Sequence, residues 1–168
     1  LGKHLLTVAN GGDLMGSLRN PGAFNLVIGV RPTDGRVPDS RGSDLFYQRM
    51  ATGGPMGRNA EDTARLLVTM AGRTPVQPLS LRDRLPDVGE WQPLDLTGVK
   101  IGWMADYDGY LPMEPGVLEI CSASLQMAAE AGAIVEPCSV DFDMDRLWQT
   151  WLTLRHWTRW SMLPLYED

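Results

Sequence analysis

Lysine, histidine and cysteine are scarce in this sequence. Lys3 and Lys100 are the only lysines among 15 basic residues, and the two histidines, His4 and His156, have no second metal ligand at helical spacing. Protein metal sites need several such ligands brought together, so we predict no metal site and no cofactor.

Long apolar runs are missing as well. No run approaches the roughly 20 residues that a membrane-spanning helix needs, and no signal-peptide pattern is present. We therefore expect a cytoplasmic chain with no membrane partner. The formal net charge of −6 argues against a nucleic-acid partner. The chain begins with Leu1 rather than methionine, and we expect its native N-terminus to lie upstream.

The two cysteines, Cys121 and Cys138, do not have metal-ligand spacing. They allow either a disulfide or two reduced thiols, and we favour two buried thiols in a reducing compartment.

Hydrophobic residues make up 43% of the sequence, a proportion typical of globular domains. The length of 168 residues is sufficient for one domain with a hydrophobic core.

Short apolar segments separated by glycine and proline characterise the first part of the chain. Gly11 and Gly12 should end the first apolar run, and Pro21 is compatible with the first turn of a helix. The pattern predicts a buried strand or helix end, a short helix, a buried β-branched strand and a loop, in that order. These elements are expected at residues 5–9, 17–24, 26–30 and 33–43.

Two later segments predict capped amphipathic helices. Asn59 is a favourable N-cap for a helix at 59–71, and Gly72 should end that helix. The second helix is expected at 115–131, with a proline near its first position and Gly132 at its end.

Strands are predicted on both sides of the second helix, at 99–104 and 133–138. This order is a βαβ unit, in which the strands are parallel and the crossover is right-handed. The fold class is therefore predicted to be α/β. A third helix should start near Met144, capped by Asp143. Its apolar residues lie nearly all round it, so we expect it to be buried on more than one side.

The most informative stretch is residues 11–38, GGDLMGSLRNPGAFNLVIGVRPTDGRVP. It places Ser17 in a glycine-rich turn, where a hydroxyl can project beside converging backbone N–H groups, as acyl transfer requires. The alternative is an ordinary turn serine, with Asp13 and Arg19 forming a surface ion pair. Residues 53–57 lack the Lys-Ser/Thr ending of a phosphate loop, so we interpret them as a turn.

Residues 13–21, DLMGSLRNP, resemble the nucleophile segment of the amidase signature hydrolases. The usual pattern there is Gly-Ser-Asp, any residue, Gly-Gly-Ser, an aliphatic residue, Arg, any residue, Pro. The likeness continues through residues 24–38, 54–72 and 96–140. The resemblance implies an α/β/α fold around a mixed sheet flanked by helices. It also implies hydrolysis of amides, and sometimes esters, through a Ser–cis-Ser–Lys triad.

The resemblance assigns Ser17 as the nucleophile and gives roles to the residues around it. Backbone N–H groups of the turn match the oxyanion hole, and two charged residues match the pair that braces this loop. The hole comprises Leu14, Met15, Gly16 and Ser17, and the bracing pair is Asp13 and Arg19. The sequence departs from the family at Gly12, where serine is usual, and at Met15, where glycine is usual. We expect Met15 to restrict the substrate rather than abolish activity.

In the family, the lysine and the cis-serine lie upstream of the nucleophile, and nothing before Ser17 matches them. Because a serine hydroxyl needs a base, we expect this chain to be inactive by itself. We predict one partial amidase-signature domain over 1–168, made of a nucleophile segment, a connection and an α/β segment. Their bounds are 1–72, 73–96 and 97–168.

Two functions from different classes follow. The first is an amidase-type serine hydrolase that acts on a small amide or ester through an acyl-enzyme on Ser17. The alternative is a truncated, non-catalytic relative that acts as a binding or assembly module. In both, a partial sheet should expose strand edges and apolar helix faces, so we expect a homo-oligomer or a partner that covers them.

Overall fold

The computed structural model describes residues 1–38 and 49–160, in two compact units, Leu1–Gln92 and Pro93–Asp168. The boundary falls inside the connection predicted at 73–96, whose regular structure is one short 3₁₀ turn, η1 (Val88–Glu90). The loop expected at 33–43 is irregular as far as residue 38, and its remainder lies outside the described residues. The single-domain organisation stays a prediction, and each unit is described by itself.

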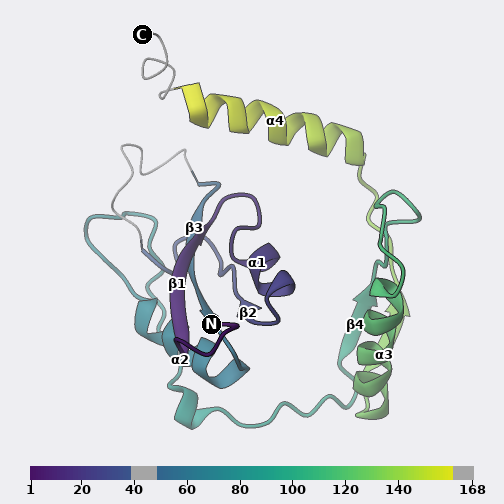
Figure 1. Ribbon diagram of the computed structural model, residues 1–168. Helices are drawn as coiled ribbons and strands as arrows, with labels where there is room; N and C mark the ends of the chain where they lie inside the picture. The colour runs from purple at the N-terminus through teal and green to yellow at the C-terminus, as the bar shows by residue number, and fades with distance from the viewer. Residues whose placement is uncertain (39–48, 161–168) are drawn as a thin grey trace. The chain divides into compact units, whose positions relative to one another are not determined.

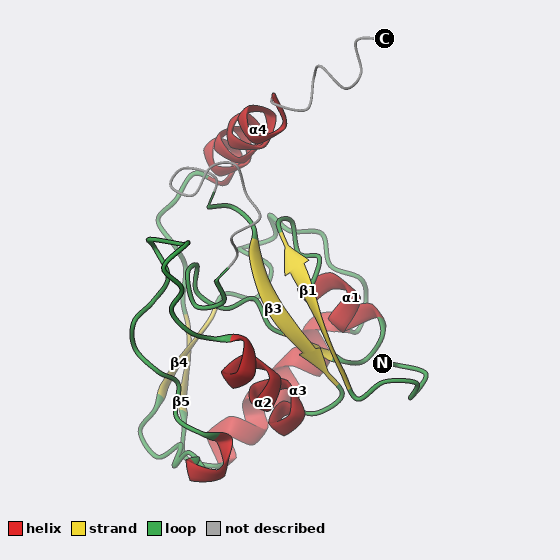
Figure 2. Ribbon diagram, turned by 90° about the vertical axis from the view of Figure 1, so that its left-hand side faces the viewer, coloured by secondary structure: helices red, strands yellow, loops and turns green. Residues whose placement is uncertain are grey.

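The first unit contains an antiparallel sheet of β1 (Val8–Asp13), β3 (Thr52–Gly57) and β2 (Ile28–Gly29), in the order β1-β3-β2. Figure 1 shows β1 and β3 side by side, and Figure 2 shows them as the two long arrows of this unit. The segment after the short helix was predicted as a longer buried strand, and this was wrong. Only two residues pair, and Leu26 is 93% exposed with a φ of 52°.

The glycines of this sheet lie inside strands. This corrects two predictions, that Gly11 and Gly12 end the first apolar run and that residues 53–57 form a turn. Gly11 and Gly12 pair with Gly54 and Gly53 across β1 and β3. Leu18, which is completely buried, explains the choice of residue. A Cβ at Gly54 would collide with the Val30 carbonyl oxygen and lie 2.8 Å from Leu18 Cδ1, and one at Gly11 would lie 3.0 Å from Leu18 Cδ2. The missing side chains therefore make room for the leucine that follows Ser17.

Two helices accompany this sheet, α1 (Arg19–Phe24) and α2 (Ala60–Met70). Both were predicted, and the cap of α2 is confirmed, because the Asp62 N–H donates to Asn59 Oδ1 at 2.8 Å. Its buried residues are Thr63 and Ala64. Thr63 packs against Gly57 of β3 so closely that a Cβ at that glycine would collide with its hydroxyl.

The second unit confirms the predicted βαβ arrangement. Strands β4 (Lys100–Trp103) and β5 (Ile134–Pro137) pair in parallel, and α3 (Val117–Glu130) connects them. Sheets flanked by helices in both units agree with the α/β class. The last helix, α4 (Met144–Trp160), is capped by Asp143, which accepts from the Arg146 N–H at 2.9 Å.

Burial in the second unit differs from the predictions. Helix α4 was expected to be buried on more than one side, yet it contains no buried residue. Its aromatic side chains stack on each other instead, with the Trp148 and Trp151 rings parallel and 5.3 Å apart. The cysteines were expected to be buried, but both thiols are free, Cys121 half-buried and Cys138 exposed. A two-stranded sheet has too little surface to cover its helices.

Among the described residues, no helix combines the length and the hydropathy that a membrane crossing requires.

Candidate active site

Asp13, the last residue of β1, organises the turn that carries Ser17. Its side chain is completely buried and accepts the backbone N–H groups of Gly16, at 2.8 Å, and of Leu18, at 3.3 Å. Gly16 has a φ of +97°, a conformation that residues with a Cβ rarely adopt. One carboxylate therefore closes the turn from inside, and Leu18 anchors the far end of the turn against the sheet.

Arg19 approaches the same carboxylate from the start of α1. Its Nε donates to Asp13 Oδ2 at 3.0 Å and its Nη2 donates to Oδ1 at 3.1 Å. This is a bidentate pairing, the strong form of an arginine–carboxylate contact. The structure thus brings together the two residues that were expected to brace the loop. Because Asp13 is fully buried, the alternative of an ordinary surface ion pair does not describe this contact.

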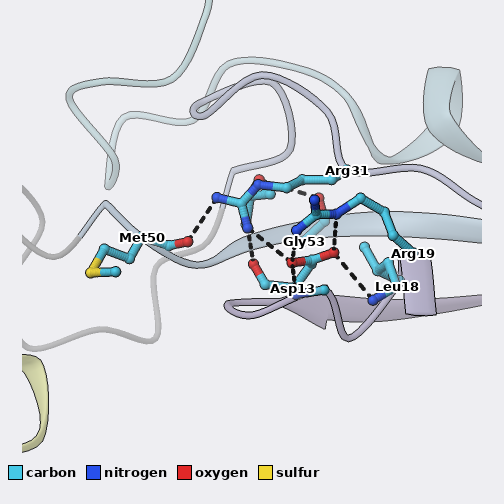
Figure 3. A network of polar contacts seen from close by, with 8 residues as sticks. Asp13, Leu18, Arg19, Arg31, Met50 and Gly53 are labelled. Atoms are coloured by element: carbon cyan, nitrogen blue, oxygen red, sulfur yellow. Dashed lines mark hydrogen bonds and ion pairs between the residues drawn. The ribbon is translucent and has the colours of Figure 1, made fainter. Parts of the chain in front are cut away.

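Arg31 is a third member of the cluster, and sequence reasoning did not select it. Its Nη1 donates to Asp13 Oδ1 at 3.1 Å and also to the backbone carbonyl of Asp13, while its Nη2 donates to the carbonyl of Met50 at 2.7 Å. Figure 3 shows its guanidinium between these groups. Arg31 therefore ties three segments together. The only signal in the sequence was an arginine placed between a β-branched run and Pro32.

The charges of the cluster are unequal, with two guanidiniums facing one carboxylate. The hydrogen bonds from Arg19 lower the pKa of Asp13 far below its usual range, and bonds from Gly16, Leu18 and Arg31 add to this. Burial acts in the opposite direction but does not prevail. The same contact with Asp13 raises the pKa of Arg19. Asp13 is therefore a permanent anion at neutral pH, held as part of the scaffold.

Ser17 is exposed at the outside of this turn. Within the described part of the chain, its hydroxyl has no hydrogen-bond partner, and neither do the N–H groups of Leu14, Met15 and Ser17. Gly16 differs from the other expected oxyanion donors, because its N–H is already bonded to Asp13. Met15 does not have a positive φ, so its side chain is tolerated, and that side chain is 47% exposed beside Ser17.

No side chain of the described residues is hydrogen-bonded to the Ser17 hydroxyl as a base would be. Lys3, the lysine of the first unit, is exposed and forms no ion pair with the described residues. The same residues hold no cluster of three or more potential metal ligands. Among the described residues, the turn therefore offers a hydroxyl and backbone donors, and no side chain is hydrogen-bonded to that hydroxyl.

The whole chain was compared with known proteins. It matches the Amidase family model over residues 1–155. The A subunit of the glutamyl-tRNA(Gln) amidotransferase of Pseudomonas putida is 35% identical over 137 residues, which are 81% of this chain and 28% of that protein. Its counterpart from Pseudomonas fluorescens is 34% identical over the same shares. The chain thus spans less than a third of the length of the curated relatives it matches.

Solved structures give the same result. A bacterial aryl acylamidase of the amidase signature family aligns with a TM-score of 0.85 and 26% identity, over 99% of this chain and 34% of that one. The native peptide amidase of Stenotrophomonas maltophilia aligns with a TM-score of 0.64 and 28% identity, over 82% and 28%. With the family match over residues 1–155, these likenesses establish that the chain belongs to the amidase signature family.

Proposed function

We propose that this chain carries the nucleophile segment of an amide-hydrolysing serine hydrolase, with Ser17 as the nucleophile. The observation that carries the proposal is the exposed hydroxyl of Ser17 in a turn whose backbone is fixed by the buried Asp13. Membership of a family that hydrolyses amides supplies the reaction class. Preorganised donors beside a nucleophile are what acyl transfer requires.

The proposed reaction proceeds in two halves. Ser17 Oγ attacks the amide carbonyl carbon while a base removes its proton, and the tetrahedral oxyanion accepts hydrogen bonds from the free N–H groups of Leu14, Met15 and Ser17. The C–N bond then breaks, the nitrogen takes the proton, and an acyl-serine ester remains. Water hydrolyses this ester and restores the hydroxyl. In this proposal Gly16 shapes the loop through Asp13 instead of donating to the oxyanion.

The base is proposed to be the lysine–serine pair that the family resemblance implies. Because the described residues place no such pair beside Ser17, we propose that the chain of 168 residues does not turn over substrate by itself. The substrate is proposed to be a small amide or ester. Met15 lies next to the nucleophile with a half-exposed side chain, so it should disfavour bulky acyl groups.

The test is labelling by a fluorophosphonate probe, which reacts with activated serines. The 168-residue chain and the complete open reading frame that contains it are compared, each with a Ser17→Ala variant. We expect labelling of the complete protein that disappears in Ser17→Ala, and little labelling of the chain alone. Unchanged labelling of the variant would assign the nucleophile elsewhere, and a complete protein that never labels would favour the non-catalytic alternative.

A further inference from the structure

A hollow of about 640 Å³ opens in the first unit. The C-terminal end of α2 forms one wall, and the segment at 82–87 forms another. Three arginines, Arg73, Arg82 and Arg84, line it and are exposed. Their side chains have no ion pair or hydrogen bond with residues that the structure describes. We call this feature the arginine hollow.

The two carboxylates that also line the arginine hollow already have partners. Arg36 donates through Nη2 to Asp83 Oδ2 at 2.8 Å and through Nη1 to the Asp83 carbonyl at 3.1 Å, and this contact lowers the pKa of Asp83. Asp87 Oδ1 accepts the Gly89 N–H at 2.8 Å at the start of η1. Three arginines and two aspartates line the hollow, and Arg36 pairs with one of these aspartates, so positive charge is locally in excess in a chain of net charge −6.

Local hydrogen bonds order the segment that joins the two walls of the arginine hollow. The nearly buried Ser80 donates to the Gln77 carbonyl at 2.8 Å and accepts the Thr74 N–H at 3.2 Å. The Leu81 N–H donates to the Gly35 carbonyl at 2.9 Å, and a Cβ at Gly35, which has a φ of +80°, would collide with the backbone carbonyl of Leu79. Because this segment is already ordered before a ligand binds, binding does not have to supply the free energy that ordering it would cost.

We propose that the arginine hollow binds a small multivalent anion with phosphate or carboxylate groups. Guanidinium groups pair with both oxyanions through two parallel N–H···O bonds. The volume lies within the range of small-molecule sites, roughly 300–1,000 Å³. Arg73 lies just beyond the C-terminal end of α2, where it offsets the partial negative charge of the helix end. Arg82 and Arg84 are then the residues that hold the anion. The proposal does not depend on Ser17.

Calorimetric titration of the 168-residue chain tests this, with pyrophosphate in one arm and citrate in the other, in a buffer free of both groups. We expect saturable binding of at least one anion, and the tighter arm identifies the preferred group. The double variant Arg82→Gln/Arg84→Gln should weaken it about tenfold or more. The matched control Arg146→Gln/Arg155→Gln removes the same charge from exposed positions of the second unit and should change affinity less than about twofold.

Absence of binding by either anion at millimolar concentration would overturn the proposal, and so would equal weakening by the control pair. Circular dichroism shows whether the double variant is folded. If it is not, Arg84→Lys decides, because it keeps the charge and loses the planar fork. That variant should bind several-fold more weakly, and unchanged affinity would overturn the proposal. Loss of Ser17 in Ser17→Ala should leave anion binding unchanged.

Discussion

The guanidinium of Arg31 donates both to the side chain of Asp13 and to its backbone carbonyl, across 18 positions of sequence. The end of β1 is therefore fixed in position by a residue that follows β2. Because Asp13 in turn fixes the N–H groups of Gly16 and Leu18, Arg31 acts on the Ser17 turn without touching it. The first prediction concerns this relationship.

Replacing Arg31 by glutamine should destabilise the first unit by about 1–3 kcal/mol, since it removes one donor from the buried Asp13 carboxylate and the Arg31 donors from the carbonyls of Asp13 and Met50. Urea unfolding monitored by circular dichroism measures this. The control is Arg65→Gln, which breaks an exposed pair with Glu61. That change should cost no more than about 0.5 kcal/mol. Equal effects of the two variants would contradict the role assigned to Arg31.

Stability should depend on the ionisation of Asp13. Its pKa is lowered in the folded protein, chiefly by Arg19, so its contribution is complete above its unfolded pKa, about 4, and is lost as pH falls below that value. Unfolding free energies of the wild type should therefore decline between neutral and acidic pH more steeply than those of Asp13→Asn. Arg19→Gln, which removes the largest cause of the shift, should give an intermediate slope. Parallel curves for all three proteins would refute this.

Gly16 should not tolerate a side chain. Gly16→Ala places a Cβ at a φ of +97° and 2.9 Å from Asn20 Cγ, so we expect a loss of about 1–2 kcal/mol. Gly12→Ala is the matched control, because a Cβ there meets nothing within 4 Å and the φ is not in the left-handed region. Thermal unfolding distinguishes them, and a control as unstable as Gly16→Ala would show that glycine is needed along the whole segment.

Leu18 should be the residue of the turn most sensitive to truncation. Leu18→Ala removes a completely buried side chain and should cost about 2–5 kcal/mol. Leu26→Ala makes the same chemical change at a site that is 93% exposed and should be nearly neutral. Chemical denaturation of both variants checks the pair. A mild effect at Leu18 would mean that the glycine-lined site collapses around the smaller residue.

The exposed apolar side chains of α3 and α4 should cause association. Ile120 is 72% exposed and Trp160 is 70% exposed. Large apolar side chains exposed to this extent are typical of a surface that binds a partner. We expect light scattering to report a mass above that of one chain, decreasing on dilution. Trp148→Ser with Trp157→Ser should shift the equilibrium towards the monomer. A wild-type monomer with cooperative unfolding would contradict the prediction.

The elements predicted well were those determined by local chemistry. Asn59 and Asp143 cap their helices as expected, because a side-chain cap depends on residues within one turn. The βαβ unit was also correct, since its periodicity changes clearly from strand to helix. The predicted contact between Asp13 and Arg19 required only a short turn between them.

The elements predicted poorly depend on partners distant in sequence. Gly11 and Gly12 were expected to end a strand, because glycine is common in turns. Both continue β1 in pairs with β3, and at Gly11 the packing of Leu18 leaves little room for a side chain. Arg31 could not be selected because nothing local connects it with Asp13. The burial expected for α4 was wrong because an apolar pattern shows that a surface prefers a partner without showing that its own unit provides one.

The paired glycines of β1 and β3 have a consequence for how variants of this chain would be interpreted in a genetic screen. Substitutions at Gly11 would press on Leu18, and substitutions at Gly54 would press on both Leu18 and the Val30 carbonyl oxygen, so both would disturb the support of the Ser17 turn. If Ser17 is the nucleophile, as proposed above, such variants would lower activity while lying in a sheet and leaving the Ser17 side chain unchanged. A map of sensitive positions would therefore include the support of the turn as well as the turn itself.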